Sequence, residues 1–220
     1  MEQEPKVQLP LSEKVKNIPG VFGIHFTEKP KYKLLKHEGD FELREYEPMI
    51  VAKVTVQGSY EEARAEAFKK LANYIFGENR EHKVMPMTAP VLQEGADVEM
   101  AIHAMEPNVL QEFPFAGNKS LTMSFVLPSD ISAKIAPLPT DSGIHIEAIP
   151  SQTWAVVTYS GENTPQDMRI NYLKLQVWLE LRGQKNESPT MRMAEYDGPN
   201  TISFLRKNEV QILIWSADLQ

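Results

Sequence analysis

Apolar and polar residues alternate with period two along two adjacent stretches of the chain, 41–46 and 49–57. Alternation of this kind is typical of strands that bury one face. Pro48 separates the two stretches, and a turn at this position predicts a hairpin. A similar pair of strand patterns occupies 144–160, and another alternating stretch covers 121–127. We therefore expect a protein that is rich in antiparallel sheet.

Two other stretches follow the helical period, with apolar residues three and four positions apart. The first begins after Ser59, a good N-cap residue, and predicts a helix over about 59–76. The second begins at Thr164 and Pro165, which suit the cap and the first turn, and predicts a helix over about 165–182. Apolar residues cover much of the circumference of the second helix, so we expect it to be the more buried one.

The order strand, strand, helix therefore occurs twice, at 41–77 and at 144–183. Gly58 and Gly161 occupy equivalent places, each after a strand and before a polar cap. We interpret the repeat as an internal duplication, because two paired ββα units can bury sheet faces that one unit leaves open. The groove between the two helices and the sheet would then be a natural ligand site. The alternative is a chance likeness between two ordinary α+β segments, since few residues are identical.

The ends and the middle of the chain lack these patterns. Prolines and glycines interrupt residues 1–30, which we interpret as an N-terminal extension. We expect one domain over 31–220, with halves at about 31–128 and 143–216. A loop that contains a ribbon at 98–104 is expected between the halves, and the final strand is expected near the C-terminus.

Composition narrows the functional classes. The chain has 220 residues, a net charge of −7 and no cysteine. The acidic balance argues against a general nucleic-acid binder and against docking on anionic lipid, because both need a basic surface. Disulfides, thiolate metal sites and cysteine nucleophiles are excluded. No apolar run approaches membrane-spanning length, so we expect a cytoplasmic protein if Met1 is the native start, and a periplasmic or anchored one if a leader was removed.

Several motifs between about Lys31 and Trp215 resemble those of the SOUL haem-binding protein family, and they occur in the family's order. The resemblance implies an α+β fold: a distorted β-barrel of antiparallel sheet flanked by two helices and built from two pseudo-twofold-related βαββ-like halves. It also implies tetrapyrrole binding without enzyme chemistry. The motifs are Phe41–Tyr46, Tyr74–Gly77, Met87–Val91, Thr122–Ser129, and Glu195–Pro199 followed by Arg206–Val210.

The resemblance also points to residues for the ligand. It places the site between the first helix and the loop before the final strand, where cations would bind the propionates of haem and apolar side chains would line the walls. Methionines suit a flat hydrophobic ligand because they are soft and adaptable. The candidate binding residues are Arg64, Phe68, Lys69, Leu71, Ala72, Ile75, Met85 and Met87.

No motif for catalysis or for a metal site accompanies these residues. The histidines are spread singly, without the spacing of a metal site, and are interpreted as surface residues. Some relatives carry a histidine as a proposed axial haem ligand at the position of Glu45, and a carboxylate is a poor substitute. We therefore expect haem without a strong axial ligand, and no enzyme activity. Arg206, Glu209 and Asp197 are expected to form an ion network that holds the last strand.

The sequence is thus interpreted as a soluble α+β domain that binds haem or another tetrapyrrole in a hydrophobic groove, as a carrier, buffer or sensor. One alternative is an effector-type module for another flat hydrophobic small molecule. A further alternative is a protein-interaction module in which the groove accepts a segment of a partner.

The extension is expected to contribute little to the core, because its prolines and glycines interrupt any long amphipathic element. A chain without residues 1–28 should therefore unfold cooperatively at nearly the same temperature as the full chain, as measured by circular dichroism. If the shortened chain fails to fold, the extension is an integral part of the domain.

Overall fold

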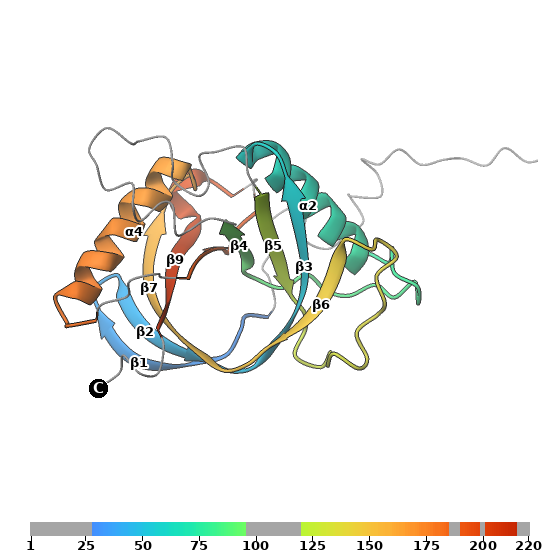
Figure 1. Cartoon of the computed structure of the whole chain (residues 1–220), viewed down its shortest axis with the longest axis horizontal. Helices are drawn as coiled ribbons and strands as arrows, with labels where there is room; N and C mark the ends of the chain where they lie inside the picture. The colour runs from blue at the N-terminus through green and yellow to red at the C-terminus, as the bar shows by residue number, and fades with distance from the viewer. Residues whose placement is uncertain (1–27, 96–119, 185–189, 199–200, 215–220) are drawn as a thin grey trace, which may run out of the picture.

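A nine-stranded antiparallel sheet dominates the fold, and it curls into a half-barrel (Figure 1). The computed structural model describes residues 28–95, 120–184, 190–198 and 201–214. The elements are β1 (Tyr32–Glu38), β2 (Phe41–Tyr46), β3 (Met49–Gln57), α2 (Tyr60–Ile75), β4 (Val91–Gly95), β5 (Ser120–Val126), β6 (Ile144–Ile149), β7 (Gln152–Ser160), α4 (Pro165–Glu180), β8 (Met191–Glu195), a 3₁₀ turn (Ser203–Leu205) and β9 (Lys207–Ile214). None of the described helices is long and apolar enough to cross a membrane.

The strand order is symmetric apart from β1. It runs β1-β2-β7-β9-β8-β4-β5-β3-β6. Counted inward from β2 and from β6, the strands of the two halves occupy equivalent places, and each half carries one helix after its second strand. A duplicated unit would produce this order. The α+β half-barrel with two helices is confirmed, and the duplication itself stays a prediction.

A single bent ribbon joins the two halves. β2 and β3 pair with β7 and β6 in one unchanged register, from Phe41 opposite Val157 to Val54 opposite Ile144. The two turns that interrupt the ribbon contain Pro48 and Pro150. Proline has no N–H to donate to a ladder, so the ribbon bends at this place and the sheet curls.

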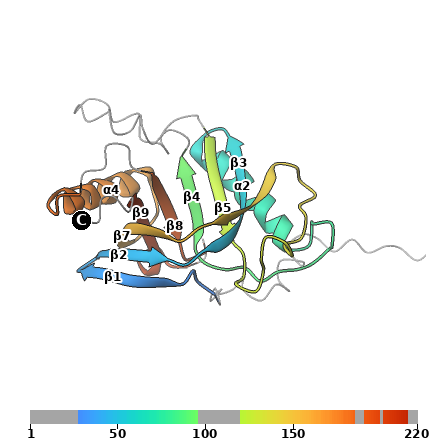
Figure 2. The ribbon, with the colours of Figure 1, turned by 60° about the horizontal axis from the view of Figure 1, so that its bottom comes forward.

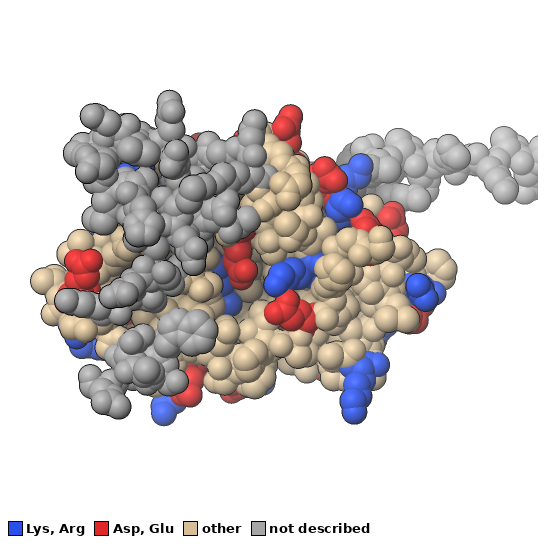
Figure 3. Space-filling model, viewed as in Figure 1, with Lys and Arg blue, Asp and Glu red and all other residues tan. Residues whose placement is uncertain are grey.

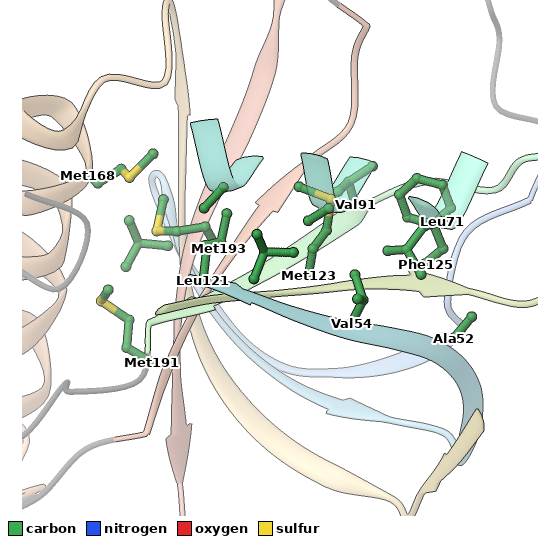
Figure 4. Close-up of a cluster of buried hydrophobic side chains, with 14 of the residues drawn as sticks. Ala52, Val54, Leu71, Val91, Leu121, Met123, Phe125, Met168, Met191 and Met193 are labelled. Carbon is green, nitrogen blue, oxygen red and sulfur yellow. The ribbon is translucent and has the colours of Figure 1, made fainter. Parts of the chain in front are cut away.

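The two helices pack on the same side of the sheet and leave its centre between them (Figure 2). α2 packs on β3 and β5, and α4 packs on β7 and β9. The core beneath them contains side chains from both helices and from all of these strands. Five buried methionines join this core, and Figure 4 labels four of them: Met123, Met168, Met191 and Met193. The fifth is Met85.

The opposite face of the sheet buries charged side chains. Arg44 on β2 and Glu209 on β9 are only 2% and 0% exposed. The Nη1 of Arg44 donates to both carboxylate oxygens of Glu209 at 3.1 Å and to the hydroxyl of Tyr46 at 2.9 Å. Tyr196 and Gln211 also donate to Glu209. The carboxylate is therefore fully hydrogen-bonded, as a buried charge must be.

A second arginine lies on this inner face. Arg192 is 2% exposed, and its guanidinium carbon lies 3.8 Å from the ring centroid of Trp154. Its Nε donates to Gln211 at 2.7 Å, which links it to the Glu209 network. Burial lowers the pKa of Arg192, because the charged form loses its hydration.

The balance at Glu209 favours the carboxylate. Burial alone would raise its pKa, but Arg44 and Lys207 outweigh burial and lower it. Burial likewise opposes the charge of Arg44, and Glu209 and Tyr46 outweigh it, so the pKa of Arg44 is raised. Each charge of the pair thus depends on the other.

Both predicted helices are present at the expected positions, but one of the two predicted N-caps differs. Thr164 caps α4 by accepting from the N–H of Asp167. Ser59 makes no such bond, and its hydroxyl donates to the Glu62 carboxylate instead. α4 has six buried residues and α2 has five, as expected of the more buried helix, but one apolar stripe of α4 faces outward. The exposed residues of this stripe are Ile170, Leu173, Val177 and the C-cap Leu181.

Other expectations are also corrected. The cations at Glu209 are Arg44 and Lys207, whereas Arg206 donates to the carbonyl of Thr201. Asp197 does hold the start of β9, since it accepts from the backbone N–H of Lys207 at 2.7 Å. The expected ribbon at 98–104 lies outside the described residues.

Replacement of Glu209 by Gln should lower the free energy of unfolding by at most about 3–5 kcal/mol at pH 7, because it leaves the buried Arg44 with Glu42 as its one remaining carboxylate among the described residues. The contribution of Glu209 is present above the ordinary glutamate pKa of 4.5 and is lost as the pH falls below this value toward the lowered pKa of the folded state. Urea titrations from pH 7 to pH 3 should therefore show a shallower acid dependence in the variant.

The matched control is Glu147→Gln, which breaks the exposed ion pair of Glu147 with Lys53. We expect a change below about 1 kcal/mol for this surface pair. Equal losses in the two variants would contradict the role assigned to the buried network.

Candidate functional site

The region between α2 and α4, where the sequence predicts a ligand groove, is the candidate site. Its floor is formed by β4 and β8, the two central strands of the sheet, which pair with each other. Val91, Met191 and Met193 belong to the core on the helix side. Gln93 and Glu195 face the same side, since they contact the α2 residues Tyr60 and Arg64. The floor is thus apolar with two polar groups.

One flank of α2 faces this groove. Arg64 and Phe68 lie one turn apart, and Ala72 follows after another turn. The side chain of Arg64 is 41% exposed, and Phe68 is 39% exposed. The ring of Phe68 packs edge-on against Phe125 of β5, with the ring centroids 5.4 Å apart. A cation and an exposed aromatic ring therefore stand side by side.

An ion pair and a chain of hydrogen bonds connect α2 with the start of α4. The Nη2 of Arg64 donates to Glu195 Oε2 at 2.8 Å. Glu195 Oε1 accepts from Asn163 Nδ2 at 2.6 Å, and the amide oxygen of Asn163 accepts from the hydroxyl of Tyr159. Asn163 directly precedes the N-cap of α4. Glu195 therefore links the two helices across the groove.

The charge of Glu195 acts on its neighbours. Burial raises the pKa of Tyr60 and of Tyr159, and the nearby carboxylate of Glu195 raises both further. Burial would lower the pKa of Arg64, but Glu195 outweighs it and the net pKa is raised. Both tyrosines therefore remain protonated donors and Arg64 remains a cation at neutral pH.

One polar group on the floor lacks a partner. Gln93 is fully buried, and its carbonyl oxygen accepts from the hydroxyl of Tyr60 at 3.1 Å. Its Nε2 has no hydrogen-bond partner within the described part of the chain. An unpaired buried donor is costly, so this amide is a polar group of the site that the described contacts leave unsatisfied.

The structure separates the eight predicted binding residues into four groups. Arg64, Phe68 and Ala72 lie together on the groove-facing flank, while Lys69 is exposed on the outer face of α2. Met87 is half-buried against the core. The remaining three are core residues with at most 2% exposure: Leu71, Ile75 and Met85. Their contact with a ligand stays a prediction.

The loop before β9 supplies further apolar surface. Ile202, Phe204 and Leu205 are exposed there. The hydroxyl of Ser203 donates to Glu162, which lies just before α4. The loop therefore presents apolar side chains beside the start of α4, and its part in a binding site stays a prediction.

Histidine and acidic residues form no metal site in the described ranges: no group of three could hold an ion. The Nδ1 of His37 lies 3.3 Å from Glu42 Oε1 on the strand surface. His82 lies in a turn and has a positive φ. Glu45, at the position of the family's strand histidine, is exposed on β2. His25 and His103 lie outside the described residues.

Sequence reasoning missed several residues at the groove. Glu195 belongs to the motif that signalled the family, but nothing in its local pattern shows that Arg64 is its partner. Gln93 and Asn163 each lie close to a strand or helix boundary, where polar residues are common. The only available signal was the repeat, which places β4, β8 and the starts of both helices near the centre of the fold.

Solved structures with the same architecture come from proteins of several kinds. The structure titled EcmrR C-terminal domain aligns with a TM-score of 0.56 at 15% identity, over 84% of this chain and 98% of that one. An uncharacterized conserved protein from Listeria innocua gives a TM-score of 0.55 at 12% identity, with 79% and 91% covered. A hydrolase from the same organism gives 0.52 at 9%, with 81% and 93% covered. At these identities the likeness concerns the fold.

Two relatives in sequence carry haem in their names. Heme-binding protein 1 of Xenopus tropicalis is 31% identical over 136 residues, which are 61% of this chain and 64% of that protein. Heme-binding protein 2 of Homo sapiens is 26% identical over 179 residues, or 78% and 80% of the two chains. The profile of the SOUL heme-binding protein family matches residues 27–213. The chain therefore belongs to the SOUL heme-binding protein family.

Proposed function

We propose that the protein binds haem or a related tetrapyrrole on the groove-facing flank of α2. The observation that carries the proposal is the exposed ring of Phe68 beside the cation of Arg64 on this flank. Family membership and the names of the relatives support a tetrapyrrole as the ligand.

The residues present fit a porphyrin in their chemistry. Phe68 and Ala72 offer apolar surface for the face of the macrocycle, which we expect to contribute about 25 cal/mol per Å² of apolar area buried. Arg64 is the cation that this flank offers to the propionates, whereas Lys69 lies on the outer face of α2. Bound haem would supply a redox-active iron, and the exposed Glu45 is a poor ligand for it. We therefore propose that apolar contact, rather than iron coordination, holds the ligand.

Binding has a competitor within the protein. Arg64 is already paired with Glu195 at 2.8 Å, so a propionate must share this cation or displace Glu195. The side chain of Glu195 is only 10% exposed and would then depend on Asn163 alone. We propose that this exchange keeps the affinity moderate, as suits a carrier, buffer or sensor that must release its ligand.

A second candidate is an effector-type module for a flat hydrophobic ligand without carboxylates. Glu195 favours it, because such a ligand would leave the ion pair with Arg64 intact. The Nε2 of Gln93, which has no partner among the described residues, would donate to a carbonyl oxygen of either kind of ligand. A protein-interaction module remains a third candidate, with the outward apolar stripe of α4 as its surface.

Titration with hemin and with protoporphyrin IX tests the first proposal. We expect both to bind with similar affinity, because the iron contributes little, and both to lose binding in Phe68→Glu. Tryptophan fluorescence quenching and the visible absorption band report the binding. The control Ala65→Glu places the same charge on the exposed outer face of α2 and should bind normally. Tight hemin binding with no binding of the iron-free porphyrin would show that an axial ligand dominates.

Variants of the ion pair test the competition for Arg64. Arg64→Gln should weaken hemin binding about three- to tenfold, and Glu195→Gln should strengthen it by a similar factor, since it frees the cation for a propionate. The control is Lys70→Gln, because Lys70 pairs with Asp141 at 2.9 Å on the other flank of α2. If Glu195→Gln weakens binding, Glu195 supports the ligand instead of competing with it.

A further inference from the structure

A separate pocket opens at the bend of the ribbon that joins the two halves. Its volume is about 410 Å³, within the range of small-molecule sites. The walls come from residues 28–31, 47–50, 126–129 and 148–149, together with Thr88 and Ile131. None of these residues belongs to α2 or α4. The pocket is therefore distinct from the proposed tetrapyrrole site.

Backbone hydrogen bonds hold the walls in place. Leu127 N–H donates to the carbonyl of Ile50 at 2.8 Å, and Glu47 N–H donates to the carbonyl of Lys31 at 2.9 Å. Glu28 fastens the entering chain, since its carbonyl accepts from Ala89 N–H and its carboxylate accepts from Ser129 N–H, each at 3.0 Å. The pocket is thus preformed, and a ligand would not have to pay for ordering it.

The floor of the pocket is apolar. Val126, Leu127 and Ile131 are buried. Met49 and Ile149 are half-buried and pack against the small apolar cluster that contains Val126. A floor built from side chains of several strands accepts an aliphatic or aromatic body and offers it no hydrogen-bond partners. Affinity from this part of the site would come from the burial of apolar surface.

Two lysines and two glutamates lie at the rim of the pocket, and they differ in their hydrogen bonds and ion pairs. Lys29 and Lys31 flank Pro30 in an extended segment, and neither forms an ion pair within the described ranges. The Nζ of Lys29 lies 5.4 Å from the ring centroid of Tyr196. The rim also has two carboxylates. That of Glu28 accepts the backbone N–H of Ser129, whereas that of Glu47 makes no hydrogen bond or ion pair within the described ranges. The rim thus offers two ammonium groups to an anion and one carboxylate to a cation.

We propose that this pocket binds an amphipathic carboxylate, with its apolar chain on the floor and its head group at Lys29 and Lys31. The site is separate from the one proposed for the tetrapyrrole. A preformed apolar pocket with unpaired cations at its rim is suited to a fatty-acid-like or aryl-acid ligand.

Calorimetric titration of the full chain with decanoate, decanol and decylamine tests the head group. These probes share one apolar chain and differ in charge. At low salt we expect decanoate to bind about tenfold more tightly than decylamine, with decanol between them. The double variant Lys29→Gln/Lys31→Gln should reduce decanoate to the affinity of decanol. Equal affinities of the three probes, tighter binding of decylamine, or no binding of any would overturn the proposal.

Filling the pocket tests its location. Ala148 is an exposed residue of the wall, so Ala148→Phe should fold normally and weaken decanoate binding at least about tenfold. Ser129→Phe is a second filling variant, and Ala65→Phe on the outer face of α2 is the matched control. If neither filling variant changes decanoate binding, the pocket is not the site.

Hemin binding distinguishes the two sites. It should be unchanged in Ala148→Phe, and decanoate binding should be unchanged in Phe68→Glu. Failure of hemin to bind at all would leave the decanoate result standing. Loss of hemin binding in Ala148→Phe would place the tetrapyrrole in this pocket, and would overturn the separation of the two sites.

Discussion

The buried pair of Arg44 and Glu209 is the constraint on which the sheet depends. Arg44 lies on β2 and Glu209 on β9, and β7 runs between these strands. The pair can form only if the inner face is curved enough for the side chains to meet over β7. Removing two charges from water costs several kcal/mol per ion, so the curved arrangement is stable only with all the hydrogen bonds in place. The charges inside the half-barrel therefore select one curvature and one register.

The curl in turn decides where ligands can bind. A flat sheet would let a single helix layer cover it, whereas this sheet turns away beneath α2 and α4 and leaves β4 and β8 between them (Figure 2). Figure 3, in the same view as Figure 1, shows a small group of positive and negative residues near the centre of this face. The Arg64–Glu195 pair bridges the gap between the helices, so ligand entry and helix spacing depend on the same contact.

Much of the fold follows from local sequence signals, and the misses have physical causes. The helices were predictable because caps and helical periodicity are local. β8 was missed because it is only five residues long and buries polar residues, Arg192 and Glu195, among its apolar ones. β1 was missed for the opposite reason, since most of its residues are exposed. The outward stripe of α4 was misjudged because periodicity shows that a face is apolar and does not show what covers it.

The candidate site also contains residues that the sequence predicted and residues that it did not. Arg64 and Phe68 were found through the family's motifs, and the helical repeat places them on one flank. The partner of Arg64 was not predictable, because Glu195 is 131 positions away and only the three-dimensional fold brings them together. Leu71 and Ile75 share the helix with these residues, but the sequence alone does not show that they face the core rather than the groove.

The near-symmetry of the strand order has one exception, and it matters for association. β1 covers the outer edge of β2, whereas β6, in the equivalent place, has a neighbour on one side only among the described strands. An open edge is a template for a strand of another molecule. β6 is six residues long, carries Glu147 on its exposed side and ends at Pro150. β1 is the edge strand at the other end of the sheet, so both ends present a strand edge. At β6, the charge of Glu147 and the proline that follows the strand oppose pairing with another molecule.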